Sequence, residues 1–93
     1  MARGLYVISY DVSDDKRRLK IMHLLEGLGE RVQYSVFEVW ASDEALDTLR
    51  EHLRPLVAEA GSVRIYPLCG KCAQVREVLG EGAPTEVEEL QIV

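Results

Sequence analysis

The chain has 93 residues, of which 47% are hydrophobic and 29% charged, so we expect one ordinary globular domain spanning 1–93, with a core at residues 3–68 and a C-terminal extension at 69–93. No apolar run approaches the ~20 residues that span a bilayer, and a strand-like segment follows Gly4 directly. We therefore expect no membrane partner and no signal peptide. Two cysteines in one short segment do not make a disulfide framework, which favours a cytoplasmic location.

The formal net charge of -5 is distributed unevenly. Residues 1–76 hold 11 basic and 11 acidic side chains, whereas residues 77–93 hold five glutamates and no base. Basic residues cluster early, between positions 16 and 31. The overall charge therefore neither supports nor excludes a partner that carries phosphate groups.

The first half of the chain predicts a strand, a helix and two further strands. Residues 5–12 form a short apolar run typical of a central strand. Ser13 is expected to cap a helix whose apolar residues recur at helical spacing up to Leu28, with Gly29 as its stop. Residues 31–41 are too long for one strand, so we expect two strands joined tightly around Ser35-Val36.

The second half predicts a helix, a strand, and a further helix and strand. Ser42 is expected to cap the helix, Pro55 to kink or restart it, and Gly61 to end it. Residues 62–68 alternate as in a strand, 71–79 suit a short helix, and 86–93 suit a last strand.

This order, β-α-β-β-α-β with an appended helix and strand, predicts an α+β fold of the ferredoxin-like type. Two helices would cover one face of an antiparallel sheet. The other face would be bare, and a second copy of the chain is the simplest cover for it, giving a homodimer.

Asp11 is the first candidate for chemistry, because it is a carboxylate at the end of an otherwise apolar strand, next to Tyr10. The alternative is that it caps a turn with Asp14 and Asp15. One carboxylate is a weak magnesium site. A two-fold dimer that brought two copies of Asp11 together could hold an ion able to activate water and clamp a phosphodiester.

Four basic residues form the second group: Arg17, Arg18, Lys20 and Arg31. Arg17 and Lys20 share one face of the predicted helix, and guanidinium groups suit contacts with phosphate oxygens. The alternative is an ordinary solvated helix face. Aromatic residues such as Phe37 are more often part of a core than a platform on which bases stack.

Cys69-Gly70-Lys71-Cys72 is a CxxC motif between a predicted strand and a predicted helix. Thioredoxin-like proteins place theirs similarly, but too few residues follow here for that fold. One CxxC is also half of a zinc site, unless a dimer supplies the other half.

Residues 5–18 (LYVISYDVSDDKRR) and 29–38 (GERVQYSVFE) together resemble two signatures of the small CRISPR-associated adaptation nuclease. This is the smaller of the two proteins shared by nearly all CRISPR systems. The similarity is good over residues 3–68 and looser beyond. Some relatives carry arginine at the position of Lys20. In this chain the ammonium group of lysine, a point charge, replaces the bidentate guanidinium group of arginine.

The resemblance implies a ferredoxin-like homodimer in which Asp11 faces its symmetry mate and holds a divalent metal, Mg²⁺ or Mn²⁺. It implies cleavage of single-stranded RNA or double-stranded DNA. It also implies a partnership with the CRISPR integrase during spacer acquisition. The implied catalytic residues are Tyr10 and Asp11. The expected nucleic-acid-binding residues, from the resemblance and the basic cluster together, are Arg17, Arg18, Lys20, Arg31 and Phe37.

Two other functions stay open at this point. The first is a non-catalytic scaffold of the same fold that bridges integrase dimers on spacer DNA. The second is a regulatory module of the same fold that binds a small ligand. Such a module would not explain why the two signatures are present, although the fold alone does not decide the function.

Overall fold

The computed structural model describes residues 3–85, which form a four-stranded antiparallel sheet with helices on both sides. The strands are β1 (Arg3–Asp11), β2 (Gly29–Gln33), β3 (Val36–Ser42) and β4 (Ser62–Leu68). The helices are α1 (Asp15–Glu26), α2 (Asp43–Leu53), the 3₁₀ turn η1 (Arg54–Leu56) and α3 (Gly70–Gln74). None of these helices is long and apolar enough to cross a membrane.

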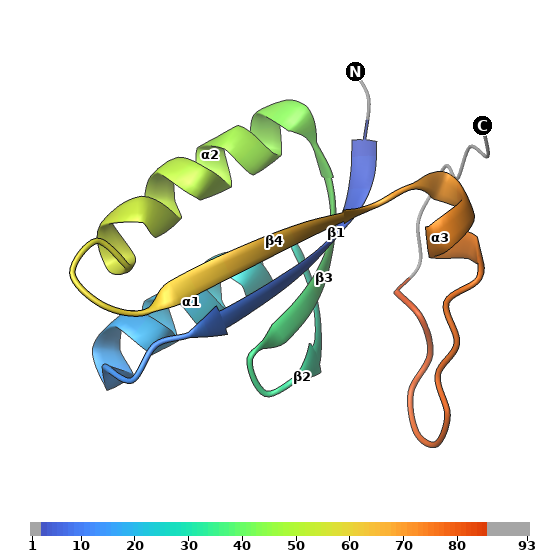
Figure 1. Cartoon of the computed structure of the whole chain (residues 1–93), viewed down its shortest axis with the longest axis horizontal. Helices are drawn as coiled ribbons and strands as arrows, with labels where there is room; N and C mark the ends of the chain where they lie inside the picture. Colours follow the sequence, from blue (N-terminus) through green and yellow to red (C-terminus); the bar gives the residue numbers. More distant parts are fainter. Residues whose placement is uncertain (1–2, 86–93) are drawn as a thin grey trace.

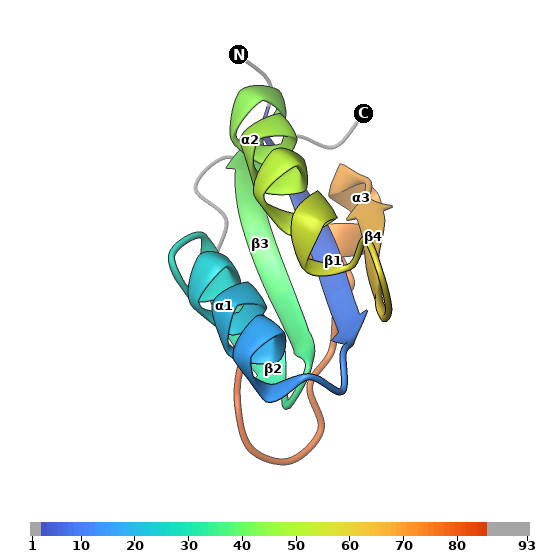
Figure 2. The ribbon, with the colours of Figure 1, turned by 90° about the vertical axis from the view of Figure 1, so that its left-hand side faces the viewer.

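The strand order β2-β3-β1-β4, with the connectivity βαββαβ, is the ferredoxin-like arrangement and confirms the predicted fold. The central strand is β1, which pairs with β3 on one side and with β4 on the other. Helices α1 and α2 lie on one side of the sheet, and α3 lies on the other (Figure 1). The view from the helix side shows α1 and α2 in front of the strands (Figure 2).

The core lies between the sheet and these two helices, on the side that we call the covered face. Alternate residues of the strands point into it, because side chains along a strand alternate between the two faces. The fully buried side chains include Ile8, Ile21, Leu25, Phe37 and Val39. The opposite side of the sheet, which we call the open face, receives the other set of side chains.

Helix α1 begins later and ends earlier than expected. Asp14, not Ser13, is its N-cap, because the Asp14 carboxylate accepts a hydrogen bond from the Arg17 backbone N–H at 2.9 Å. The helix ends at Glu26 with Gly27 as its cap, and Leu28 is exposed. Gly29 is therefore not a helix stop. It is the first residue of β2, where a Cβ would overlap the Glu38 carbonyl oxygen.

Helix α2 starts as predicted, since Ser42 Oγ accepts a hydrogen bond from the Ala45 backbone N–H at 3.2 Å. It ends at Leu53, before the 3₁₀ turn that contains Pro55, rather than at Gly61. Gly61 has a positive φ of 90°, and a Cβ there would lie 2.9 Å from the Asp11 carbonyl oxygen. Glycine at this position lets the start of β4 approach the end of β1.

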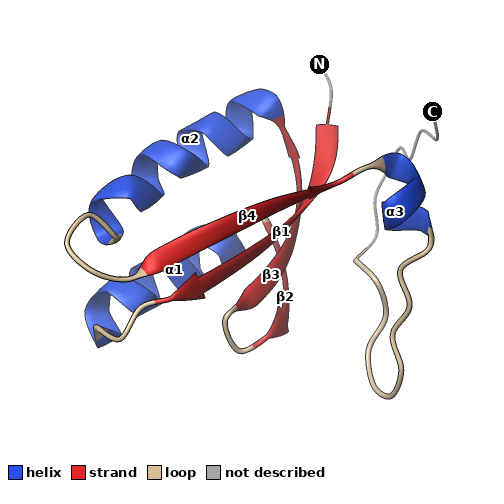
Figure 3. Ribbon diagram, viewed as in Figure 1, coloured by secondary structure: helices blue, strands red, loops and turns tan. Residues whose placement is uncertain are grey.

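One end of the open face is covered by the chain that follows β4 (Figure 3). Helix α3 is shorter than the predicted 71–79 and packs on β1 and β4, burying Ala73 and Leu5. Arg76 Nη1 donates to Glu38 Oε1 at 2.8 Å, and Glu38 Oε1 also accepts from the Thr85 backbone N–H at 3.2 Å. The strand predicted at 86–93 lies outside the described residues.

Candidate active site

Tyr10 and Asp11 are neighbours in the chain but lie on opposite faces of the sheet. Tyr10 points into the covered face and is 5% exposed, whereas Asp11 is exposed on the open face. The alternation of side chains along β1 dictates this separation. Within one chain, the two predicted catalytic residues therefore do not meet.

The surroundings of Asp11 are polar and include a basic residue that the sequence did not single out. Asp11 pairs with Ser62 of β4, and Ser9 pairs with Arg64, so these four side chains share the open face. Diagonal neighbours of this kind lie about 7–8 Å apart, within reach of a long side chain. Arg64 is exposed, and the ion pairs among residues 3–85 leave it without a carboxylate partner.

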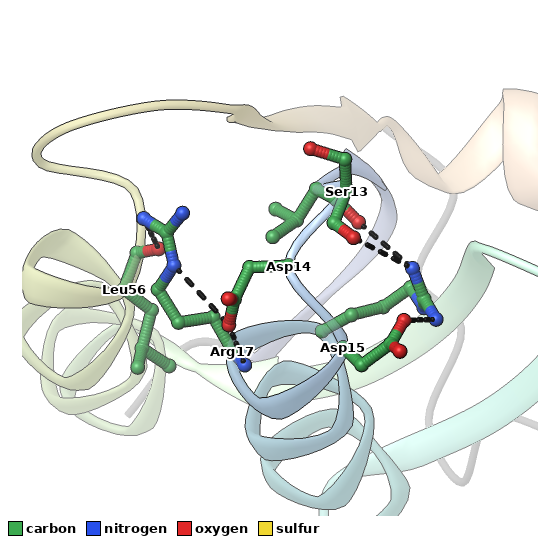
Figure 4. Close-up of polar contacts among 7 residues, drawn as sticks. Ser13, Asp14, Asp15, Arg17 and Leu56 are labelled. Carbon is green, nitrogen blue, oxygen red and sulfur yellow. Dashed lines mark hydrogen bonds and ion pairs between the residues drawn. The ribbon is translucent and has the colours of Figure 1, made fainter.

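The start of α1 holds Arg17 against Asp14 and Leu56 (Figure 4). Arg18 also contacts its own chain. Arg17 reaches the Leu56 carbonyl oxygen at 3.4 Å and the Asp14 carboxylate at 3.5 Å. Arg18 donates to the carbonyl oxygens of the β1–α1 loop at 3.3 and 3.4 Å, and its other nitrogen pairs with Asp15. The hydrogen bond to Asp15 raises the pKa of Arg18 above its ordinary value.

Arg31 turns back onto the tight turn between β2 and β3. Its Nε and Nη2 donate to the Tyr34 carbonyl oxygen at 3.0 and 2.6 Å, and its guanidinium carbon lies 5.0 Å from the centre of the Tyr34 ring. This stacking is a favourable cation–π arrangement. Tyr34 itself is exposed.

Tyr10 contacts both the β2–β3 turn and the core beneath it. Its hydroxyl donates a long hydrogen bond of 3.5 Å to the Tyr34 carbonyl oxygen, and its ring packs on Phe37 with centroids 6.3 Å apart. Burial raises the pKa of Tyr10 above its ordinary value of 10.0, although Arg31 opposes the shift. The phenol is therefore protonated at neutral pH and can donate a proton in a hydrogen bond but not act as a base.

A pocket of about 380 Å³ opens between α1 and the β2–β3 turn on the covered side. Its lining comprises Tyr10, Asp15, Arg18, Leu19, Met22, Arg31 and Tyr34. Three of the predicted site residues, Tyr10, Arg18 and Arg31, thus come together here. Asp11 is not among the residues that line this pocket.

The remaining predicted residues lie elsewhere. Phe37 is fully buried beneath Tyr10, so the expectation that it contacts nucleic acid directly is corrected: in this chain it packs the core. Arg17 faces the η1 turn rather than the pocket. Lys20 is exposed on α1.

A divalent metal fits Asp11 only as one ligand of a larger site. Among residues 3–85 no group of three or more His, Cys, Asp or Glu side chains could hold an ion. Asp14 caps α1 and Asp15 pairs with Arg18, so neither joins Asp11. Magnesium commonly takes one or two carboxylates together with water and phosphate oxygens. Asp11 suits that role once a second carboxylate or a substrate phosphate completes the site.

The comparison with protein families shows which family the chain belongs to. The family described as CRISPR associated protein Cas2 matches residues 4–76. The chain belongs to the Cas2 family. A relative from Thermus thermophilus, named CRISPR-associated endonuclease Cas2 2, is 42% identical over 94 residues and covers all of both chains. Another from Chloroflexus aurantiacus, named CRISPR-associated endoribonuclease Cas2 1, is 46% identical over 90% of this chain and 92% of its own.

Solved structures agree with this assignment to the Cas2 family. A hypothetical protein from Thermus thermophilus superposes with a TM-score of 0.78 at 42% identity, covering 91% of this chain and 100% of that one. A chain from a structure described as a partial Cas6-RT-Cas1–Cas2 complex gives a TM-score of 0.70 at 31% identity, covering 82% and 90%. The ferredoxin-like fold is thus shared with proteins of this family.

Proposed function

We propose that this Cas2 protein is a homodimeric, metal-dependent endonuclease that works with the CRISPR integrase in spacer acquisition. The observation that carries the proposal is the position of Asp11, an exposed carboxylate at the end of the central strand, on a sheet face that the helices α1 and α2 leave open. Two curated relatives are named as an endonuclease and an endoribonuclease, which supports hydrolysis of phosphodiester bonds.

The dimer is proposed to form through the open face. Beyond the end covered by α3, this face presents half-buried or exposed apolar side chains, among them Val7, Val36 and Tyr66. A chain of this length buries a limited core, so covering these side chains with a second copy is favourable. A two-fold axis near the end of β1 would bring both copies of Asp11 to one place.

Mg²⁺ or Mn²⁺ is the proposed cofactor, with the two Asp11 carboxylates as its protein ligands. Such an ion, when bound, supplies an activated water and neutralises charge on the phosphate. Arg64 lies on the same face and has no carboxylate partner among the described residues, so it is placed to grip a phosphate oxygen beside Asp11. Tyr10 serves as a positioning residue: its buried ring fixes the end of β1 and thereby the direction of Asp11.

The nucleic acid is proposed to run over the end of the sheet, where the β1–α1 loop and the β2–β3 turn meet. Lys20 is free to approach phosphate groups, while Arg17, Arg18 and Arg31 also hold these loops in shape through their carbonyl contacts. Arginine suits both phosphate binding and these carbonyl contacts, because its guanidinium group has five N–H donors. The proposed substrates are single-stranded RNA, double-stranded DNA or both.

One observation favours a second candidate, a non-catalytic scaffold that bridges integrase subunits. A single chain offers one exposed carboxylate at the proposed centre and, within residues 3–85, no preformed metal cluster. The chain from the Cas1–Cas2 assembly shows a related protein within such a complex. In this case spacer acquisition would require the fold of the protein but not the Asp11 carboxylate.

The experiment that separates them measures cleavage of labelled single-stranded RNA and duplex DNA by the wild type and by Asp11→Ala, with magnesium and with chelator. Metal-dependent cleavage that disappears in the variant, while the dimer persists, supports the nuclease. Full cleavage by the variant would overturn the assignment of Asp11. No cleavage by either protein, with DNA still bound and integration still supported, would establish the scaffold.

A further inference from the structure

The CxxC motif lies where β4 passes into α3, at the end of the sheet remote from Asp11. Cys69 immediately follows the last residue of β4, and Cys72 lies in the first turn of α3. Both thiols are exposed and free. The proposed nuclease uses neither of them, so their proximity needs its own explanation.

The two cysteines are in direct contact. The Cys72 backbone N–H donates to Cys69 Sγ at 3.4 Å. The hydrogen bond from the Cys72 backbone is the main cause that lowers the pKa of Cys69 below its ordinary value of 9.0. The pKa of Cys72 is raised, chiefly by the neighbouring Cys69 side chain.

This asymmetry divides the chemical roles of the pair. A thiolate, not a thiol, attacks a disulfide, so the sulfur that ionises more readily reacts first. The Cys72 backbone N–H stabilises Cys69 as the thiolate, and Cys72 holds its proton longer. Because both are exposed, a small reagent can reach the first sulfur and leave the second free to follow.

We propose that Cys69 and Cys72 form a redox-active dithiol that exchanges with low-molecular-weight disulfides and closes into an intramolecular disulfide. In the first step the Cys69 thiolate attacks one sulfur of the small disulfide, forming a mixed disulfide and releasing one small thiolate. Cys72 then loses its proton and attacks Cys69 Sγ, which releases the second small thiolate. The pair loses two electrons and two protons, and the small disulfide becomes two thiols.

Closure of the pair would act on a part of the molecule that organises the open face. The α3 helix packs on β1 and β4 through the buried Ala73, and the chain just beyond it carries Arg76 to its partner Glu38. A disulfide would fix the first turn of α3, whereas the reduced pair leaves this turn to its hydrogen bonds. A disulfide between Cys69 and Cys72 would therefore constrain the start of the segment that covers this end of the open face.

A structural zinc ion is the competing use of two neighbouring thiols. One chain supplies only two sulfur ligands, and residues 3–85 hold no further His, Cys, Asp or Glu side chains that would complete a set of three. Structural zinc takes four ligands. The dithiol interpretation needs no group from outside the chain except the small disulfide.

The test uses the full-length reduced protein, titrated with oxidised glutathione and then examined by mass spectrometry. We expect a species lighter by two hydrogen atoms that dithiothreitol reverses. Cys72→Ser should accumulate one glutathione adduct on Cys69, because the backbone N–H of residue 72 still donates to Cys69 Sγ in that variant. Iodoacetamide should likewise label Cys69 before Cys72 in the wild type.

Three results would overturn the proposal. The first is failure of the wild type to form the intramolecular disulfide. The second is labelling of Cys72 by iodoacetamide before Cys69, or of both at the same rate, in the wild type. The third is recovery of about one chelator-removable zinc ion for every two chains of reduced protein, which would assign the thiols to a metal shared between copies. Each of these results is independent of nuclease activity. The dithiol proposal is therefore tested separately from the function proposed above.

Discussion

The two faces of the sheet use the same strands for different purposes. On the covered face, Ile8, Phe37 and Val39 are fully buried beneath α1 and α2. On the open face, the alternate positions of the same sheet carry Asp11 and Arg64, both exposed. A difference of one residue in the chain thus decides whether a side chain supports the fold or meets a partner.

This comparison separates two ways in which a substitution can abolish activity. A change on the covered face acts through stability, because close-packed cores tolerate little loss of volume. A change on the open face near Asp11 acts on chemistry and leaves the core intact. Loss of activity alone does not identify a catalytic residue here, and each variant needs both measurements.

The largest expected effect is on the covered face. Phe37→Ala removes a fully buried ring that packs on Tyr10, and we expect a loss of about 3–5 kcal/mol in the free energy of unfolding. Chemical denaturation followed by circular dichroism measures it. Phe37→Leu, which keeps most of the apolar volume, should lose much less. Unchanged stability with loss of nucleic-acid binding would contradict the packing role.

A smaller effect is expected where the chain after α3 is fastened to the open face. Arg76→Ala leaves Glu38 without its partner in an ion pair whose side chains are both 15% exposed, which should reduce stability by about 1.5–3 kcal/mol. Arg50→Ala is the matched control, because its pair with Asp47 is exposed and should contribute less than about 1 kcal/mol. Equal losses in the two variants would show that the Arg76 pair does not fasten this segment.

On the open face, Arg64→Ala should slow cleavage by about 10- to 100-fold, as expected for the loss of a charged hydrogen bond to phosphate. Its unfolding free energy should change by no more than about 0.5 kcal/mol, because the side chain is exposed. Arg54→Ala, in an exposed pair with Glu51, controls for the removal of one positive charge. Equal rates in the two variants would exclude Arg64 from the site.

The smallest expected effect concerns the cap of α1. The Arg17 backbone hydrogen bond is the main cause that lowers the pKa of Asp14 below its ordinary value of 3.8. The carboxylate therefore stabilises the fold above that value, and the contribution disappears as the pH falls through the folded pKa. Asp14→Ala should lower the melting temperature slightly at pH 7, and the difference from wild type should vanish in acid. Asp14→Asn, which can still cap, should lose less; a difference between Asp14→Ala and wild type that persisted in acid would contradict this origin.

The sequence predicted the elements and the fold because apolar side chains recur at the periods of strands and helices. It misplaced the ends of both long helices, since Gly29 and Gly61 are required by close approaches of distant backbone and not by helix termination. Such approaches depend on tertiary structure and leave no local pattern. The cap at Asp14 was missed because Ser13 and Asp14 are both good caps, and only the backbone geometry chooses between them.

The candidate site was predicted in part. Asp11 was found as a carboxylate out of pattern in an apolar strand, and the basic residues were found as a cluster. The separation of Tyr10 from Asp11 onto opposite faces follows from the alternation of side chains along β1. Arg64 was missed because its place beside Asp11 depends on the register between β1 and β4, which are far apart in the sequence.

The most direct test of this division compares two neighbours, Asp11→Asn and Tyr10→Phe, in parallel measurements of magnesium-dependent cleavage and unfolding free energy. We predict that Asp11→Asn slows cleavage by about 100-fold or more, since several kcal/mol of metal stabilisation are lost, with stability within about 0.5 kcal/mol of wild type. Tyr10→Phe keeps the buried ring, loses only a long hydrogen bond, and should cleave within about threefold of wild type. Equal, severe losses of cleavage in both variants at unchanged stability would contradict the division of roles between the two faces.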